Sequence, residues 1–240
     1  MTVRFLTSGD TGLIVEFGDT IDRAVNERVL LLNQKLNRLR LPGVIETIPT
    51  FRSLLVLYDP VKTSSSNLKA LIAQVLEKKT SASSEATLWR IPVCYAPEFA
   101  PDLPDVCART GLSAERVVAL HLERQYRVYM LGFLPGFPYM GDLAEPLRLP
   151  RRADPRTRVP AGSVAIATSM TGIYPVESPG GWHLIGRTPI KLFDLNWDPP
   201  SLLAPGDVVM FEEIGVEEFR QIEQAAESDL YRPAREKIRV

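Results

Sequence analysis

The uneven distribution of proline and glycine is the feature that most constrains how this chain can fold. Residues 132–206 hold 12 of the 20 prolines and 9 of the 15 glycines, in less than a third of the 240 residues. Proline breaks regular hydrogen bonding and glycine favours turns, so this stretch is typical of short strands joined by tight turns. The first 90 residues contain only Pro42, Pro49 and Pro60. We therefore expect two domains with different architectures.

Residues 1–80 are predicted to form a small α/β sandwich domain. Short strands are expected at 4–7 and 13–17, followed by a helix for which Thr20 is the candidate N-cap. Two further strands at 44–51 and 53–58 precede a second helix that one of the serines 64–66 would cap. The order ββαββα indicates an antiparallel sheet with helices on one face.

Residues 81–86 are predicted to be a linker, because the surrounding segment KKTSASSEA is small and polar and cannot bury a core. Residues 87–240 are predicted to form a second, mainly-β domain. Its clearest strands are expected at 88–95, 163–168, 182–185, 190–193 and 207–211, with short helices near 105–109 and 114–122 and a helical tail at 216–226. Many short strands between Gly/Pro turns favour a β-barrel or a sandwich.

Composition excludes several classes of protein. A formal net charge of -1 and 45% hydrophobic residues argue against a disordered chain and against a basic nucleic-acid-binding protein. Two cysteines cannot make a disulfide framework, and no Cys/His spacing suggests a metal. Neither a signal peptide nor a membrane-spanning run is visible, so we expect a cytoplasmic protein with no nucleic-acid or membrane partner.

Several long motifs occur in order along nearly the whole chain. They are GDTGLIVEFGD (9–19), SLLVLYDP (53–60), IPVCYAPEFAPDL (91–103), GFLPGFPYMGDL (132–143), PRRADPRTRVPAGSVAIATSMTGIYPVESPGGWHLIGRTPIKLFD (150–194) and LLAPGDVVMF (202–211). With these motifs the chain resembles the family of bacterial 5-oxoprolinase B subunits, also called allophanate hydrolase subunit 1 or the KipI-type histidine-kinase inhibitor family.

The resemblance implies both a fold and an activity. It implies an N-terminal α/β domain followed by a cyclophilin-like β-barrel domain. It also implies one member of a hydrolase complex, inactive alone, that opens the lactam of 5-oxo-L-proline with ATP and water together with the C and A subunits of 5-oxoprolinase. The alternative is a protein that binds and inhibits a sensor histidine kinase. A carboxyltransferase-like module is a third, weaker alternative, because no biotin-carrier or carboxylase segment is fused to the chain.

ATP-driven lactam opening requires fixed cations for the phosphate and the substrate carboxylate. Five arginines lie between positions 148 and 158, opposed only by Asp154. Arg158 and Arg187 are the favoured anion ligands, because each borders a Gly/Pro-dense motif, whereas arginines such as Arg151 and Arg152 are expected to be solvated. No Walker or GxGxxG motif is present, so the ATP site on this chain is left open and ATP is assigned to the complex.

The SPGGW segment offers a further candidate for anion binding. Ser178, Gly180 and Gly181 could direct backbone N–H groups at an anion, or could simply form a tight turn before a strand. A stiff aromatic loop could wall a pocket for a cyclic amide, or could plug the end of a barrel. The candidate pocket residues are Phe133, Pro135, Phe137, Tyr139 and Tyr174.

Two residues are candidates for acid–base catalysis. His121 matches a Leu-His position of the family, although a lone histidine on a helix is more often buried. Glu177 is the carboxylate nearest the SPGG motif, and its alternative is a solvated turn residue. His183, Cys94 and Cys107 are interpreted as structural.

Overall fold

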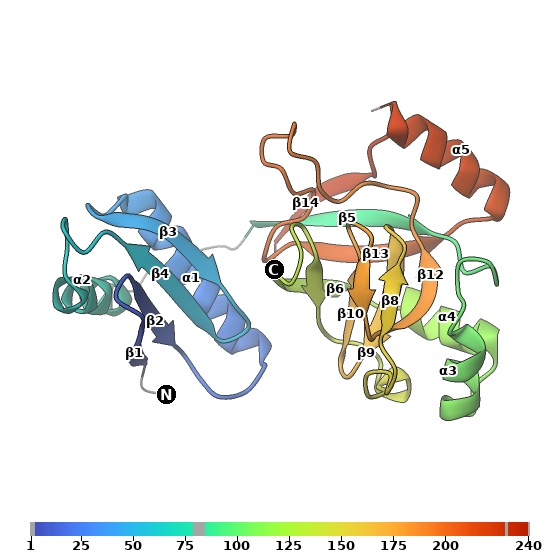
Figure 1. Ribbon diagram of the computed structural model, residues 1–240, viewed down its shortest axis with the longest axis horizontal. Coiled ribbons are helices and arrows are strands. Elements are labelled where there is room, and N and C mark those ends of the chain that lie inside the picture. The colour runs from blue at the N-terminus through green and yellow to red at the C-terminus, as the bar shows by residue number, and fades with distance from the viewer. Residues whose placement is uncertain (1–2, 79–84, 229, 240) are drawn as a thin grey trace. The chain divides into compact units, whose positions relative to one another are not determined.

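A computed structural model describes residues 3–78, 85–228 and 230–239, and the chain divides into two compact units, Met1–Ser84 and Glu85–Val240 (Figure 1). Residues 81–84 of the predicted linker lie outside the described residues. Its last two residues, Glu85 and Ala86, begin the first strand of the second unit.

The first unit has the predicted order ββαββα. Its elements are β1 (Arg4–Ser8), β2 (Gly12–Glu16), α1 (Arg23–Leu39), β3 (Val44–Pro49), β4 (Ser53–Tyr58) and α2 (Ser65–Glu77). The strands pair in the order β1-β2-β4-β3, all antiparallel. Alternate residues of β2 and β4, such as Val15 and Val56, are fully buried with Val29 of α1 and Ile72 of α2. This is the sheet with helices on one face that the sequence predicts.

The helix caps of this unit only partly match the prediction. The side chain of Asp22 accepts a hydrogen bond from the backbone N–H of Val25 at 3.1 Å, so Asp22 is the N-cap of α1 and Thr20 is not. Ile21 lies before the helix and is 53% exposed. Ser64 caps α2 by accepting from the backbone N–H of Asn67, as predicted for the serine run.

The second unit is mainly β. Its elements are β5 (Glu85–Val93), α3 (Leu103–Thr110), α4 (Ala114–Leu122), β6 (Tyr126–Leu131), β7 (Pro138–Met140), the 3-10 turn η1 (Glu145–Leu147), β8 (Arg156–Val159), β9 (Ser163–Ala167), β10 (Met170–Ile173), β11 (Ser178–Gly180), β12 (His183–Arg187), β13 (Val208–Glu213), α5 (Val216–Glu227) and β14 (Arg235–Arg239). The predicted fold class, α+β followed by mainly β, is therefore confirmed.

Eight of these strands form one curled sheet in the order β12-β9-β10-β7-β6-β13-β5-β14. Just beyond β5, the backbone of Cys94 exchanges two hydrogen bonds with Arg187 of β12, at 2.8 and 2.9 Å. This bridge brings β12 back to the end of β5, so the sheet curls around a core that includes Ile91, Val128 and Ile166. β8 and β11 form a separate two-stranded sheet.

Two details of the second unit differ from the prediction. Residues 190–193 do not form a strand, and Phe193 makes only an isolated bridge to Ser201. The charged segment REKIR forms β14, which pairs with β5 and which the sequence did not reveal. Among the described residues, no helix has the length and apolar character needed to cross a bilayer.

Candidate functional site

An aromatic cluster is centred on Phe137, which follows the turn before β7. Its ring makes edge-on contacts with Phe133, Tyr139, Tyr174 and Trp182, at centroid distances of 5.0 to 5.7 Å. Phe137 and Tyr174 are 1% exposed, whereas Phe133 is 63% exposed and Tyr139 is half-buried. The cluster therefore has a packed inner part and a rim that faces solvent.

Glycines let these rings approach the backbone. A Cβ on Gly172 would lie 2.8 Å from the Phe137 ring, and one on Gly180 would lie 2.3 Å from the Tyr174 hydroxyl oxygen. Gly136 has φ +76°, in the region that favours glycine, and forms the turn that directs Phe137 inward. The glycines of this motif thus seat aromatic side chains.

The predicted pocket residues divide between two environments. Phe137 and Tyr174 belong to the packed interior, which matches the alternative of a plug in the barrel. Phe133 and Pro135 are exposed, and Tyr139 lies between the two groups. The structure brings four of the five together, but their role as a substrate wall stays a prediction.

Asp102 organises part of the arginine-rich loop. Its carboxylate is buried and accepts hydrogen bonds from Arg152 Nη1 at 2.7 Å, from both Arg156 Nη atoms at 2.6 and 2.7 Å, and from the backbone N–H of Leu184 at 2.7 Å. The expectation that Arg152 is solvated is therefore wrong, because its side chain is only 26% exposed and is paired. Sequence reasoning missed Asp102, which lies fifty residues before its partners.

Arg158 and Glu177, predicted as an anion ligand and a base, bind each other. Arg158 Nε and Nη2 donate to the two Glu177 carboxylate oxygens at 3.0 and 2.9 Å, in an exposed bidentate pair. These hydrogen bonds lower the pKa of Glu177 below its ordinary value. A general base for neutral pH needs the opposite shift, so the geometry favours the alternative of a surface turn residue.

Arg187 is held at the end of β12. Its Nε donates to the carbonyl oxygen of Ala161 at 2.9 Å, and its Nη2 lies 3.9 Å from a Glu223 carboxylate oxygen on α5. These contacts tie α5 and the segment before β9 to the sheet. Its proposed contact with an anion has no direct support in this geometry.

The first three residues of the SPGG segment form a strand, and the segment does not form a nest of N–H groups. Ser178 pairs with Val159 and Gly180 with Arg156, so the segment forms β11 beside β8. Neither Gly180 nor Gly181 has positive φ. Ser178 is buried, and its hydroxyl donates to the carbonyl oxygen of Pro179 at 3.2 Å. These features favour a structural role for the motif over binding of a phosphate.

His121 lies in the core of the second unit, away from solvent, with an exposure of 0%. Its Nδ1 lies 2.8 Å from the Tyr95 hydroxyl and its Nε2 lies 3.0 Å from Thr171 Oγ1. Burial lowers the pKa of His121 to about 3. A neutral, enclosed ring cannot meet a substrate directly, so the structure favours the alternative of a buried helical histidine.

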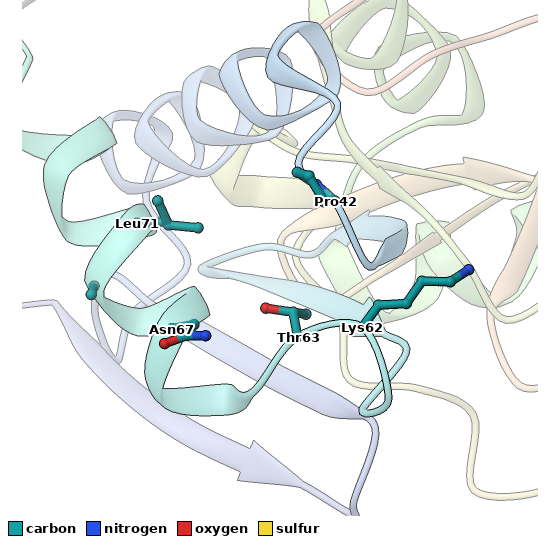
Figure 2. Close-up of a pocket in the computed structure, with 6 residues that line it drawn as sticks. Pro42, Lys62, Thr63, Asn67 and Leu71 are labelled. Atoms are coloured by element: carbon teal, nitrogen blue, oxygen red, sulfur yellow. The ribbon is translucent and has the colours of Figure 1, made fainter.

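A shallow pocket of about 330 Å³ lies in the first unit, between the start of α2 and the turn after α1 (Figure 2). It is lined by Pro42, Lys62, Thr63, Asn67, Ala70 and Leu71. In Figure 2 the Lys62 side chain extends away from Asn67 and Leu71, and its ammonium lies 3.4 Å from an Asp59 carboxylate oxygen. The pocket contains no pair of residues suited to acid–base chemistry.

Neither a nucleotide site nor a metal site is evident among the described residues. The described part of the chain contains no group of three His, Cys, Asp or Glu residues able to hold a metal ion. Of the glycines proposed for a phosphate cradle, Gly180 lies in a strand and Gly181 follows it, neither with positive φ, and the favoured Arg158 is paired with Glu177.

Comparison with known proteins gives the family. Residues 3–203 match the family described as "Carboxyltransferase domain, subdomain C and D". The chain is 40% identical over 232 residues to the 5-oxoprolinase B subunit of Bacillus subtilis (strain 168), which spans 91% of this chain and 97% of that protein. It is 41% identical over 203 residues to the 5-oxoprolinase B subunit of Escherichia coli O157:H7, in an alignment that spans 85% of this chain and 92% of that protein. The chain belongs to the family of 5-oxoprolinase B subunits.

This membership confirms the resemblance that the motifs carry and does not favour the kinase-inhibitor alternative. The fold of the 5-oxoprolinase B subunits also occurs inside a larger protein. The crystal structure of the K. lactis urea amidolyase aligns with a TM-score of 0.80 over 98% of this chain and 16% of that one, at 22% identity. At that identity the match shows the fold alone.

Proposed function

We propose that this chain is the B subunit of an ATP-dependent 5-oxoprolinase, which opens 5-oxo-L-proline to L-glutamate together with the C and A subunits. The observation that carries the proposal is near-full-length similarity to two proteins named as 5-oxoprolinase B subunits, at 40% and 41% identity. We expect the complex to act in the cytoplasm.

We expect this chain alone to be insufficient for the reaction. The reaction consumes one lactam, one ATP and two waters, one added across the amide and one taken up in releasing phosphate, and yields glutamate, ADP and phosphate. The lactam amide resists attack by water, and phosphorylation of its oxygen makes the carbon electrophilic. Because the described residues offer no fitting phosphate cradle, we assign nucleotide binding to another protein of the complex. This chain would then bind and orient the substrate ring.

The rim of the aromatic cluster, with Phe133 and Tyr139, suits the apolar faces of a five-membered ring. Arg187 remains a candidate anion ligand only if its contacts to Ala161 and Glu223 rearrange in the complex. His121 and Glu177 would need comparable rearrangement to act as acid or base.

Reconstitution tests the proposed function. The B, C and A subunits are purified separately, and ATP-dependent glutamate release from 5-oxo-L-proline is measured for the full set and with each protein omitted. The full set should turn over and this chain alone should not. A full set that forms no glutamate contradicts the function, and robust turnover by the single chain contradicts the need for partners.

A further inference from the structure

The backbone on both sides of Arg151 is attached to the two chain neighbours of Trp182, which belongs to the aromatic cluster. Before it, the carbonyl oxygen of Pro150 accepts a hydrogen bond from His183 Nε2 at 2.9 Å. After it, the backbone N–H of Arg152 donates to the carbonyl oxygen of Gly181 at 2.8 Å. These two contacts flank Trp182, so Arg151 is held beside the Trp182 backbone.

The guanidinium of Arg151 influences both phenols of the cluster. Burial raises the pKa of Tyr139, and the positive charge of Arg151 opposes that rise. Burial also raises the pKa of Tyr174, opposed first by the backbone N–H of Trp182 and then by Arg151. Both phenols therefore stay neutral and able to donate a hydrogen bond, with a cation near them.

Positive charge is in excess at this place. Arg152 and Arg156 share the single carboxylate of Asp102. Arg151 is exposed and forms no ion pair with a carboxylate among the described residues. Arg151, Arg152 and Arg156 thus carry three positive charges against the two carboxylates of Asp102 and Asp154, which leaves one charge that an anion would neutralise.

We propose that Arg151, assisted by Tyr139 and Arg156, binds the carboxylate of a small cyclic amide whose ring packs against the rim of the aromatic cluster. This inference rests on the proposed function and names the part of the substrate that this chain recognises. A planar carboxylate matches the guanidinium fork, whereas the absence of an N–H nest in the SPGG strand argues against a phosphate. Asp102 is a positioning residue, because it fixes the loop through Arg152 and Arg156.

The test uses the reconstituted complex and two ligands that differ only in the carboxylate. In Arg151→Gln, the KM for 5-oxo-L-proline should rise about tenfold or more, with kcat within about threefold of wild type. The inhibition constant of 2-pyrrolidinone, which has the same ring without the carboxylate, should stay within about twofold. Because Arg151 is exposed and unpaired among the described residues, this variant should fold normally.

Two further variants make the result specific. Arg156→Lys keeps the charge but loses the fork, so it should raise KM in the same direction. The matched control is Arg116→Gln, which removes an exposed arginine of α4 paired with Glu123 and should leave both constants unchanged.

The outcomes separate this inference from the proposed function. A wild-type complex without turnover contradicts the proposed function, and calorimetric titration with the same two ligands then tests the site. A working complex in which Arg151→Gln has an unchanged KM overturns the site. A variant that weakens 5-oxo-L-proline and 2-pyrrolidinone equally also overturns it, because the lost contact is then not with the carboxylate.

Discussion

At the scale of single residues, the hydrogen bonds of His121 define its tautomer. The Thr171 hydroxyl donates to the carbonyl oxygen of Ala165 at 3.0 Å, so its oxygen must accept from the His121 Nε2–H. The Nδ1 atom therefore accepts from the Tyr95 hydroxyl. The ring also stacks on Phe211, with centroids 4.5 Å apart. A second proton on this ring would turn Nδ1 into a donor. The Tyr95 hydroxyl would then lose the acceptor to which it donates.

This arrangement predicts a specific loss of stability in acid. The folded-state pKa of His121 is about 3 and its ordinary value is 6.5, so between these values the unfolded state binds the extra proton. The free energy of unfolding should fall by about 1.4 kcal/mol per pH unit from this residue alone, below pH 6. Denaturant unfolding at pH 7.0, 5.5 and 4.5 should show a steeper loss in wild type than in His121→Gln. Equal slopes would contradict the assignment.

Asp102 carries a second prediction at this scale. Removing its carboxylate in Asp102→Ala leaves Arg152, Arg156 and the Leu184 N–H without their acceptor. Because the arginines are partly exposed, we expect a loss of about 2 to 4 kcal/mol, below the full cost for a buried pair. The control Asp105→Ala breaks an exposed pair with Arg109 and should cost less than about 1 kcal/mol. Thermal and denaturant unfolding measure the loss of stability in both variants. Similar losses would contradict the role of Asp102 in organising the loop.

At the scale of secondary-structure elements, the packing of β11 against Tyr174 depends on Gly180 and not on the neighbouring Gly181. In Gly180→Ala the new methyl group would lie 2.3 Å from the Tyr174 hydroxyl oxygen. Relief requires movement of a buried ring, with an expected cost of about 1 to 3 kcal/mol. Gly181→Ala is the matched control, because its nearest neighbour would be Pro155 at 3.6 Å. A Gly180→Ala variant as stable as Gly181→Ala would contradict this role.

The elements also show how far the sequence predicts the fold. Hydrophobic spacing correctly predicts the helices of the first unit, and Gly/Pro density correctly predicts the mainly-β second unit. The strand β14 escapes detection because REKIR is charged, as is common at sheet edges, and its pairing with β5 joins segments about 150 residues apart. The sequence favours Thr20 as the N-cap of α1, two residues before the observed Asp22, because Thr and Asp are both good caps.

The candidate site is less predictable than the fold, because its residues find partners that are far away along the chain. The arginine cluster is visible in the sequence, but which arginine is paired depends on Asp102, which reaches it only through the fold. Similarly, the sequence predicts Arg158 as an anion ligand and Glu177 as a base. Their ion pair with each other follows from the pairing of β8 with β11. Local pattern identified the residue types, and tertiary pairing determined their partners.

At the scale of the whole molecule, we predict a stable complex with the C subunit of 5-oxoprolinase. Activation of an amide oxygen creates an intermediate that water must not reach prematurely, and an interface between two proteins can exclude water. The same fold also occurs inside one long polypeptide, the K. lactis urea amidolyase. A stable interface of this kind buries at least about 1,000 Å² in total. The co-expressed B and C subunits should therefore co-elute in size-exclusion chromatography at micromolar concentration, and Arg151→Gln should co-elute equally well. Separate elution of the wild-type proteins would contradict the prediction of a stable complex, whereas loss of co-elution in Arg151→Gln alone would place that arginine in the interface between the two proteins.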